Sequence, residues 1–304
     1  MHSFGRHGSW RLNRAAIVVR VVKNLISVLQ LGTIDYATAL RLQQRLVELR
    51  KDGRIGDVLL LLEHTAVITL GRNAKAANVI ASAEQLAQRG VEVFECDRGG
   101  DVTFHGPGQL VGYPIFDLRG MTSSDGQRKT LGAVEFVRRL EEVLIRTCAD
   151  FGIPTKRVCG LTGVWTDPQA VWGRPPSAVQ VERSSTVSHS NDEAKIAALG
   201  IHISRAVSSH GFALNVNTDL DYFNLIIPCG ITSKPVTSIA KELGKQIELQ
   251  EVAHAISCNF GVVFQSQMLW LETVEALLHP SVGVPMRPPA ELRQLRGEKD
   301  IFWG

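Results

Sequence analysis

Residues 98–113 read RGGDVTFHGPGQLVGY, and this stretch is the most informative part of the chain. It holds five glycines and one proline in sixteen residues. Glycine costs conformational entropy inside helices and strands, so such a cluster indicates tight turns or a close approach to the backbone. Alternation over 102–104, the breaker run 106–108 and apolar Leu110 and Val111 predict a loop, a short strand, a tight loop and a second strand. Two interpretations follow: the segment wraps a ligand, or it is a glycine-rich hairpin without one.

Composition limits the class of protein. The chain has 304 residues, enough for one large domain or two small ones, with 44% apolar and 21% charged residues. A net charge of +3 without a basic stripe argues against a nucleic-acid binder. No apolar run approaches the ~20 residues of a membrane span. The five cysteines are odd in number and form no CxxC, which argues against disulfides or zinc and favours a reducing compartment.

The elements expected from periodicity form no regular βαβ sequence. Asp35 is a plausible N-cap for a helix that ends at Gly53, and a longer helix spans 131–151 with Cys148 on its apolar stripe of Val134, Val137, Leu140 and Leu144. Shorter helices are expected at 82–89 and 251–264. Strands are expected at 17–22, 26–31, 58–62, 67–70, 91–94, 162–165, 212–216, and as a pair, 195–199 and 201–203, around Gly200. This mixture predicts an α+β fold with a mixed sheet and flanking helices.

Cys229 and Lys195 are the candidate chemical groups. Cys229 follows an apolar run and stands between Pro228 and Gly230, which places its thiol on a tight turn. A thiolate is a nucleophile, and a nearby cation lowers the pKa of a thiol. From local sequence alone a buried, inert cysteine remains an alternative. Lys195 begins an apolar segment after a polar loop, where a solvated lysine is also expected.

The glycine-rich stretch 98–113 and three motifs in register resemble the lipoyl(octanoyl) transferases. The motifs are KIAALG from Lys195, HGFALN from His210 and PCG around Cys229. That family has a cysteine thirty-four residues after the lysine, and the separation from Lys195 to Cys229 is also thirty-four. The resemblance covers roughly Leu31 to Val263.

The resemblance implies the fold of biotin and lipoate protein ligases. It also implies a catalytic domain at 31–266 with a loop insertion at 167–193, an N-terminal extension at 1–30 and a C-terminal extension at 267–304. The insertion is either a lid or a tolerated surface loop. The acid-poor N-terminal extension is a transit peptide, a basic tail or the result of an over-long start.

The activity implied is transfer of an octanoyl group from octanoyl-acyl carrier protein to a lysine of a lipoyl domain, the first step of endogenous lipoate synthesis. Cys229 would carry the acyl thioester, and Lys195 would stabilise the thiolate and act as acid and base. No cofactor or metal is expected. The acceptors would be lipoyl domains of 2-oxoacid dehydrogenases and the glycine-cleavage carrier protein. By the same resemblance the acyl site is lined by Arg98, Gly99, Gly100, Asp101, Val102, Thr103, Phe104, His105, Ala198, Leu199, Gly200, Gly211, Phe212 and Ala213.

Several alternatives remain open. An ATP-dependent ligase of the same fold needs no thiol, an amidotransferase would use an acylated protein as donor, and a non-catalytic module would only dock the carrier protein. His105 is a base, an oxyanion donor or a structural group, and the same alternatives stay open for His210. Lys234 is a surface charge or a contact for the acidic carrier protein. We expect a monomer in the cytoplasm, with the mitochondrial matrix as the alternative.

Overall fold

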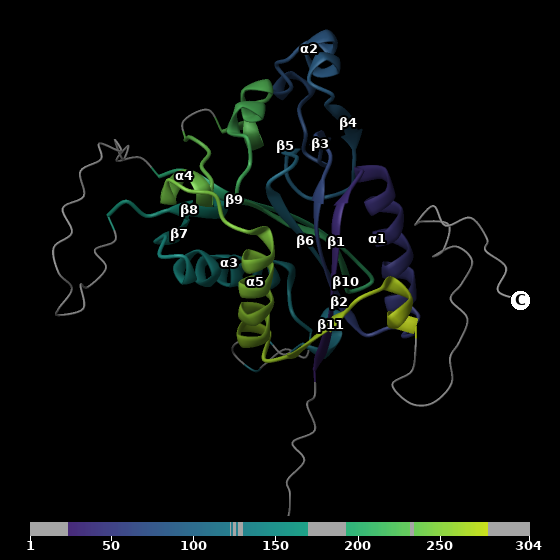
Figure 1. Cartoon of the computed structure of the whole chain (residues 1–304). Helices are drawn as coiled ribbons and strands as arrows, with labels where there is room; N and C mark the ends of the chain where they lie inside the picture. The colour runs from purple at the N-terminus through teal and green to yellow at the C-terminus, as the bar shows by residue number, and fades with distance from the viewer. Residues whose placement is uncertain are drawn as a thin grey trace, which may run out of the picture.

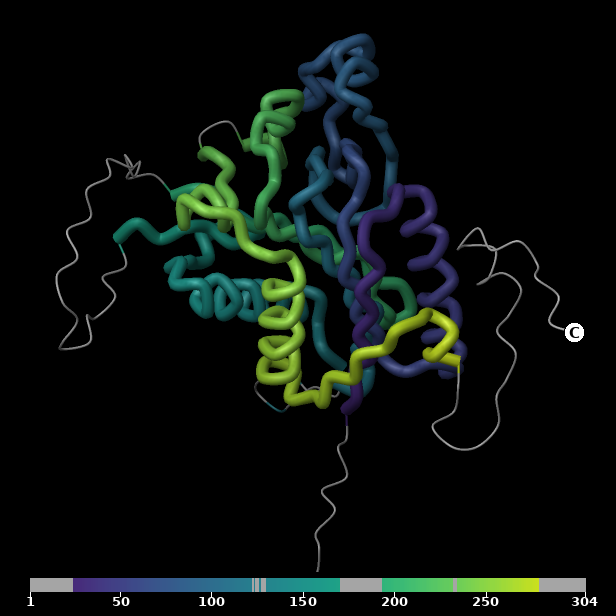
Figure 2. The backbone as a smooth tube through the Cα atoms, viewed as in Figure 1, coloured from purple at the N-terminus to yellow at the C-terminus, as the bar shows by residue number. Residues whose placement is uncertain are grey.

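A computed structural model of the chain describes residues 24–278, apart from 122, 124–125, 127–129, 170–192 and 232–233. The strand expected at 17–22, most of the loop expected at 167–193 and the tail from His279 therefore lie outside the described residues. Figure 1 shows two sheets, a large one through the centre of the molecule and a small one at the top, with helices on both sides of the large sheet, and Figure 2 traces the path of the backbone in the same view.

The large sheet has eight strands and mixed direction. Strand β1 pairs in parallel with β2 and β11, and the remaining neighbours pair antiparallel. Its spatial order is β11 (Gln267–Leu271), β1 (Leu25–Ile34), β2 (Asp57–His64), β6 (Gln109–Ile115), β10 (Val207–Asn215), β9 (Lys195–Ser204), β8 (Leu161–Thr166) and β7 (Thr155–Val158). The expected α+β class with a mixed sheet is confirmed.

The small sheet is built from three strands beside the carboxyl ends of β1 and β2. Its order is β4 (Glu92–Glu95), β3 (Val67–Leu70) and β5 (Val102–His105). It has its own apolar cluster, in which Phe104 stacks on Tyr222 with ring centroids 4.7 Å apart. The glycine-rich stretch thus joins the two sheets, since β5 belongs to the small sheet and β6 to the large one.

Helices cover both faces of the large sheet. On one face α3 and α5 pack together over Leu59 and Leu61 of β2, and on the other α1 packs over Val58, Leu60 and Leu62. The alternation along β2 follows from the two-residue period of a strand. The helices are α1 (Tyr36–Lys51), α2 (Ala83–Gln88), α3 (Ala133–Asp150), α4 (Ile239–Leu243) and α5 (Leu249–Phe264), with short 3-10 turns η1 (Ala76–Asn78), η2 (Leu118–Gly120), η3 (Leu220–Leu225), η4 (Pro228–Gly230) and η5 (Val274–Leu278).

The expected cap at Asp35 and the core position of Cys148 are confirmed, and the expected extent of the apolar stripe on α3 is wrong in detail. Asp35 caps α1 by accepting a hydrogen bond from the Thr38 amide at 2.8 Å. Cys148 is fully buried on α3, and this burial raises the pKa of its thiol to about 12. Val134 does not belong to the apolar stripe of that helix, because it is 76% exposed; the stripe begins at Phe136.

Gly200 does not separate two strands. It lies inside the single ten-residue strand β9, opposite Gly211 of β10. The actual turn of this hairpin is Arg205–Ala206, with φ of 50° and 64°, the geometry of a tight two-residue hairpin loop. Neither residue is a typical turn former, so the sequence did not indicate the turn.

On one side of the large sheet, strands β1 and β11 include residues outside the range 31–266 expected for the catalytic domain. Strand β1 begins at Leu25, and β11 pairs with β1 in the register Leu25 to Gln267.

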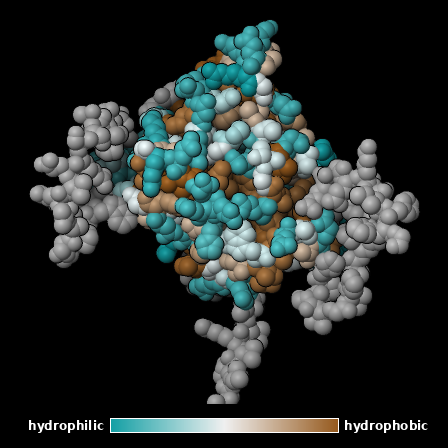
Figure 3. All heavy atoms as spheres, in the orientation of Figure 1, coloured by the Kyte–Doolittle hydropathy of each residue, from teal (hydrophilic) through white to brown (hydrophobic). Residues whose placement is uncertain are grey.

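Polar side chains cover much of the face shown in Figure 3, with hydrophobic ones visible between them. None of the helices within the described ranges has the length and hydropathy needed to cross a bilayer.

Candidate active site

Cys229 lies on the short turn η4, directly after an apolar segment. Its backbone has φ 55° and ψ 21°, a left-handed conformation that is uncommon for a residue other than glycine. Gly230 follows with φ 67°, and its amide donates to the carbonyl of Ile227 at 3.1 Å. The thiol is half-buried. Strained backbone of this kind is often found at functional sites, because the surrounding structure must hold it in place.

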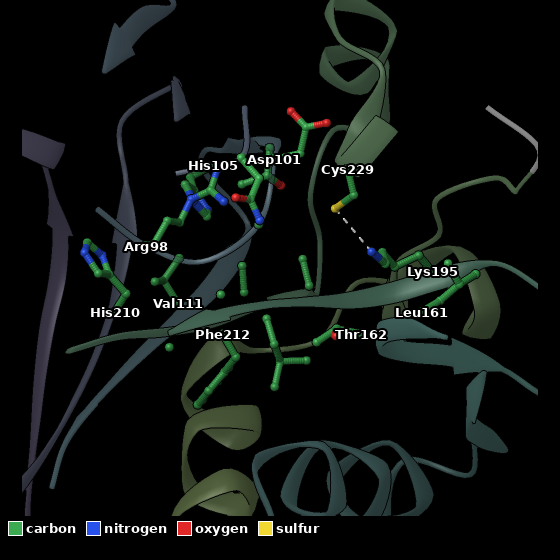
Figure 4. Close-up of a pocket in the computed structure, with 18 of the residues that line it drawn as sticks. Arg98, Asp101, His105, Val111, Leu161, Thr162, Lys195, His210, Phe212 and Cys229 are labelled. Carbon is green, nitrogen blue, oxygen red and sulfur yellow. Dashed lines mark hydrogen bonds between the residues drawn. The ribbon is translucent and has the colours of Figure 1, made fainter. Parts of the chain in front are cut away.

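Lys195 is the first residue of β9, and it meets Cys229 across thirty-four residues of chain. Its Nζ donates to Cys229 Sγ at 3.3 Å, as the dashed line in Figure 4 shows. Although it is a lysine, it is only 6% exposed. Its backbone is held on both sides, by the carbonyl of Pro235 at 2.8 Å and the amide of Thr237 at 2.9 Å. This contact places the amino group of Lys195 directly beside the thiol, in a site that is largely shielded from water.

Trp165 of β8 lies beneath this pair. The Nζ atoms of Lys195 and Lys234 are 4.9 Å and 5.8 Å from the centre of its ring. Lys234 also contacts Glu193 at 2.5 Å, and Glu193 forms a second ion pair with Lys156 at 2.8 Å. The tryptophan face therefore supplies an attractive surface for the Lys195 ammonium within a buried site.

The glycine-rich stretch packs directly against β9. The Gly99 amide donates to the Ile201 carbonyl at 3.0 Å, and a Cβ added at Gly200 would lie 2.5 Å from the Gly99 carbonyl oxygen. Arg98 ties the glycine-rich stretch to β3, because its guanidinium donates to the Thr69 carbonyl at 2.6 Å and to the Thr69 hydroxyl. Gly200 is thus required for close backbone approach rather than for a turn.

Asp101 links this stretch to the turn that carries Cys229. Its carboxylate accepts hydrogen bonds from the amides of Lys75 at 3.0 Å and Val102 at 2.8 Å, and from the side-chain amide of Asn78 at 2.5 Å. The carbonyl of Asn78 in turn accepts from the amide of Ile227 at 2.7 Å.

The two histidines of the motifs are hydrogen-bonded to groups other than Lys195 and Cys229. His105 Nδ1 faces Gln109 Oε1 at 2.8 Å and its Nε2 faces the Thr69 hydroxyl at 3.4 Å. Burial, followed by the proximity of His64, lowers the pKa of His105 to about 3, so the ring is neutral at physiological pH. This is the geometry of a structural histidine. His210 lies at the opposite end of the cavity from Cys229 (Figure 4), and its Nε2 donates to the carboxylate of Asp97 at 2.7 Å.

A cavity of about 380 Å³ opens beside the thiol and runs between the two sheets. Eleven of the expected acyl-site residues line it, together with both members of the pair: Arg98, Gly100, Asp101, Thr103, His105, Ala198, Leu199, Gly200, Gly211, Phe212, Ala213, Lys195 and Cys229. Gly99, Val102 and Phe104 do not. Val102 and Phe104 are buried in the core of the small sheet because alternate residues of β5 face away from the cavity.

Other lining residues were not among those expected to form the acyl site. They come from α1, β6 and the β7–β8 turn as well as from beside the motifs: Tyr36, Asn73, Val111, Tyr113, Gly160, Leu161, Thr162, His210 and Ile231. Most lie outside the matching segments, and only the packing of distant elements brings them to the cavity. Val111 and Tyr113 do lie in the glycine-rich stretch, where the alternation of β6 could have indicated them.

The remaining four cysteines are free thiols that differ in their exposure, and Cys148 among them is buried. Cys159 and Cys258 are exposed and Cys96 is half-buried. Within the described part of the chain, no group of three or more histidines, cysteines or acidic residues is arranged to hold a metal ion.

The fold is shared with lipoate protein ligases. A bipartite lipoate protein ligase from Thermoplasma acidophilum superimposes with a TM-score of 0.57 at 16% sequence identity, covering 82% of this chain and 86% of that one. A structure of lipoate-protein ligase A bound with ATP superimposes with a TM-score of 0.54 at 16% identity, covering 81% and 87%. The chain therefore has the fold of the lipoate protein ligases.

The sequence comparisons narrow this class. The family model of the lipoyl protein ligase A/B catalytic domain matches residues 35–261, and the chain belongs to this family. It is 57% identical to the octanoyltransferase of Koribacter versatilis, over 92% of this chain and 100% of that protein. It is 54% identical to the octanoyltransferase of Acidobacterium capsulatum, over 84% and 96%. The expected membership of the octanoyltransferase family is confirmed.

Proposed function

We propose that this chain transfers an octanoyl group from octanoyl-acyl carrier protein to a lysine of a lipoyl domain through a thioester on Cys229. The acyltransferase class rests on the octanoyltransferases that match nearly the whole chain. The covalent route rests on one observation, the 3.3 Å contact between Lys195 Nζ and Cys229 Sγ at the mouth of the cavity.

The first half-reaction exchanges one thioester for another. The Cys229 thiolate attacks the carbonyl carbon of the donor, the bond from that carbon to the carrier's sulfur breaks, and the carrier leaves as a thiol after taking a proton. Lys195, as an ammonium beside the sulfur, is placed both to favour the thiolate and to supply that proton. The free energy of exchanging one thioester for another is close to zero, so the reaction needs no nucleotide to drive it.

The second half-reaction forms the amide. The amine of the acceptor lysine attacks the acyl carbon, the bond from carbon to Cys229 Sγ breaks, and the amine loses a proton. Neutral Lys195 would take that proton and return to the ammonium form. The acyl chain would lie along the cavity, against the glycine-bearing backbones of β9 and β10 and the motif residues that line it.

The rival activities differ in what they need. An ATP-dependent ligase would require nucleotide, and an amidotransferase would require an acylated protein as donor. A docking module would tolerate replacement of Cys229. The contact between buried Lys195 and the Cys229 thiol supports the acyl-enzyme, because neither a ligase nor a docking module needs a thiol nucleophile.

Intact-mass spectrometry of the protein mixed with octanoyl-acyl carrier protein, without ATP, tests this proposal. We expect a gain of one octanoyl group that is absent in Cys229→Ala, slowed in Lys195→Ala and retained in Cys159→Ala, which removes an exposed cysteine. No adduct on the wild-type chain would exclude this route with this donor. Addition of a lipoyl domain should then discharge the adduct and add the octanoyl group to the domain. We further propose a monomer acting in the cytoplasm, which size-exclusion chromatography and cell fractionation would check.

A further inference from the structure

A second cavity adjoins the turn that carries Cys229. It has a volume of about 490 Å³ and is lined by Pro228 and Ile231, on either side of the cysteine. Ile231 also lines the cavity proposed to hold the acyl chain. Pro228 also lines a small cavity that Cys229 itself lines. The turn η4 is therefore a wall common to two large cavities, and we call the second one the outer groove.

The outer groove also comes close to the amine of the reacting pair. Lys234 lines the groove, and its Nζ lies 5.8 Å from the centre of the Trp165 ring. The Nζ of Lys195 lies 4.9 Å from the centre of the same ring. The charge of Lys234 is matched by the carboxylate of Glu193 at 2.5 Å. The groove thus reaches the neighbourhood of both Cys229 and Lys195.

The walls of the outer groove are mostly apolar, with a few polar groups. The apolar part includes Ile80, which is 57% exposed. The polar groups other than Lys234 are Asp221, Asn224 and Lys241. Apolar walls with a few placed polar groups are typical of small-molecule sites. Lys241 of α4 is exposed and forms no ion pair among the described residues, so its charge is available to an anion.

The donor in the proposed function has a part that the acyl cavity does not account for. A carrier protein holds its acyl group as a thioester at the end of a 4′-phosphopantetheine arm, a long chain with apolar carbons, amides, a hydroxyl and a phosphodiester. When Cys229 attacks, the carbonyl carbon carries the acyl chain on one side and the sulfur of this arm on the other. The acyl cavity runs from Cys229 and Lys195 toward His210 (Figure 4), so an acyl chain laid along it leaves the arm on the Cys229 side. The outer groove adjoins that side.

We propose that the outer groove binds the phosphopantetheine arm of the donor, with Lys241 as the residue that pairs with its phosphate. This inference rests on the proposed function and adds a second subsite to it. The apolar wall covers the carbon chain of the arm, and Asp221 and Asn224 offer hydrogen-bond partners to its hydroxyl and amide groups. Lysine is a common phosphate ligand because its ammonium is a point charge that carries three donors. Arm and acyl chain then meet at Cys229 from two cavities.

The test offers three octanoyl thioesters to the full chain: octanoyl-4′-phosphopantetheine, octanoyl-pantetheine, which lacks the phosphate, and octanoyl-N-acetylcysteamine, which keeps only the end of the arm. Intact-mass spectrometry follows the acylation of Cys229. Wild type should react roughly three- to tenfold faster with the phosphorylated donor than with octanoyl-pantetheine, the effect of one charged contact. Lys241→Gln should abolish this preference. Lys245→Gln, at an exposed lysine that does not line the groove, should keep it.

A second variant tests the space in the groove rather than its charge. Asn224 is exposed and lines the groove, so Asn224→Trp places a large ring there. It should slow acylation by both long donors at least about fivefold, because the arm and the ring compete for one volume. Acylation by octanoyl-N-acetylcysteamine should be unchanged, which also shows that the variant is folded. Equal slowing with all three donors would contradict an arm in the groove.

The remaining outcomes separate this inference from the proposed function. The inference is wrong if wild type shows no phosphate preference, or if the preference persists in Lys241→Gln. It is also wrong if the preference is lost in Arg72→Gln, at the exposed arginine beside Asn73 of the acyl cavity, because the arm then enters by another path.

If octanoyl-acyl carrier protein itself gives no adduct on wild type, the proposed function fails. Calorimetric titration of free 4′-phosphopantetheine and pantetheine into wild type and Lys241→Gln then still decides on the groove, and it also does so if no small donor reacts. Tighter binding of the phosphorylated compound by wild type alone supports the assignment. Equal binding of the two compounds by wild type overturns it.

Discussion

The carboxylate of Asp101 and the side-chain amide of Asn78 form a hydrogen bond of 2.5 Å, and through it the glycine-rich stretch holds the turn of Cys229. The Asn78 carbonyl bonds the Ile227 amide, two residues before the cysteine. A Cβ added at Gly230, just after the cysteine, would lie 3.1 Å from the same carboxylate. The position of the thiol therefore depends on residues more than a hundred positions earlier in the chain.

Asn78→Ala should lower the free energy of unfolding by about 1–2 kcal/mol, because it leaves one oxygen of a part-buried carboxylate unpaired. It should also slow acylation of Cys229, since the left-handed turn loses a support. Urea denaturation and intact-mass kinetics measure the two effects. A double-mutant cycle with Asp101→Ala provides the control: additive effects of the two changes would show that this bond does not couple the segments.

Trp165→Leu should slow alkylation of Cys229 by iodoacetamide at neutral pH by ~3- to 10-fold, because the Lys195 ammonium loses the ring that faces it. Trp165→Phe keeps an aromatic face and should slow the alkylation less than Trp165→Leu does. Peptide mapping separates Cys229 from the exposed Cys159 and Cys258. Equal rates in the leucine variant and the wild type would show that the tryptophan only fills space.

Gly200→Ala should destabilise the protein by about 1–3 kcal/mol and impair acylation, because the added methyl meets the Gly99 carbonyl and forces the glycine-rich stretch away from β9. Gly56→Ala is the matched control, since a Cβ there meets no atom within 4 Å and its φ is not in the left-handed region. Thermal unfolding of both variants is the measurement. Similar melting temperatures would contradict the close contact.

Stability should fall as the pH drops below about 6.5, before most carboxyl groups titrate. Burial lowers the pKa of His64 to about 4, so the folded state keeps this ring neutral while the unfolded chain takes up a proton. The stabilisation is complete above the unfolded pKa and is lost toward the folded one, at up to about 1.4 kcal/mol per pH unit. The lowered pKa of His105 contributes to the same fall in stability at low pH.

Urea denaturation between about pH 7.5 and pH 5.5 measures this slope. His64→Gln should reduce it, because glutamine can keep a hydrogen bond without titrating. His254→Gln, at an exposed histidine, should not change it. A slope that is unaffected by His64→Gln would assign the pH dependence to other groups.

Local sequence was sufficient where one short pattern decides one local outcome. The N-cap at Asp35, the buried strand around Leu60 and the core position of Cys148 follow from cap chemistry and periodicity, which act over a few residues. The α+β class follows from the order of such elements. The motifs at 98–113, Lys195 and Cys229 also indicated the family before any contact was known.

Only the tertiary structure decided what depends on contacts between distant segments. It shows that Gly200 allows close packing inside a strand, and that Phe104 belongs to the core of the small sheet rather than to the cavity. It also shows that Tyr36 lines the cavity from helix α1. Such facts depend on which face of an element meets which neighbour, and periodicity does not specify the neighbour. The same holds for the 3.3 Å contact of Lys195 with Cys229, because a spacing of thirty-four residues along a chain does not fix a distance in space.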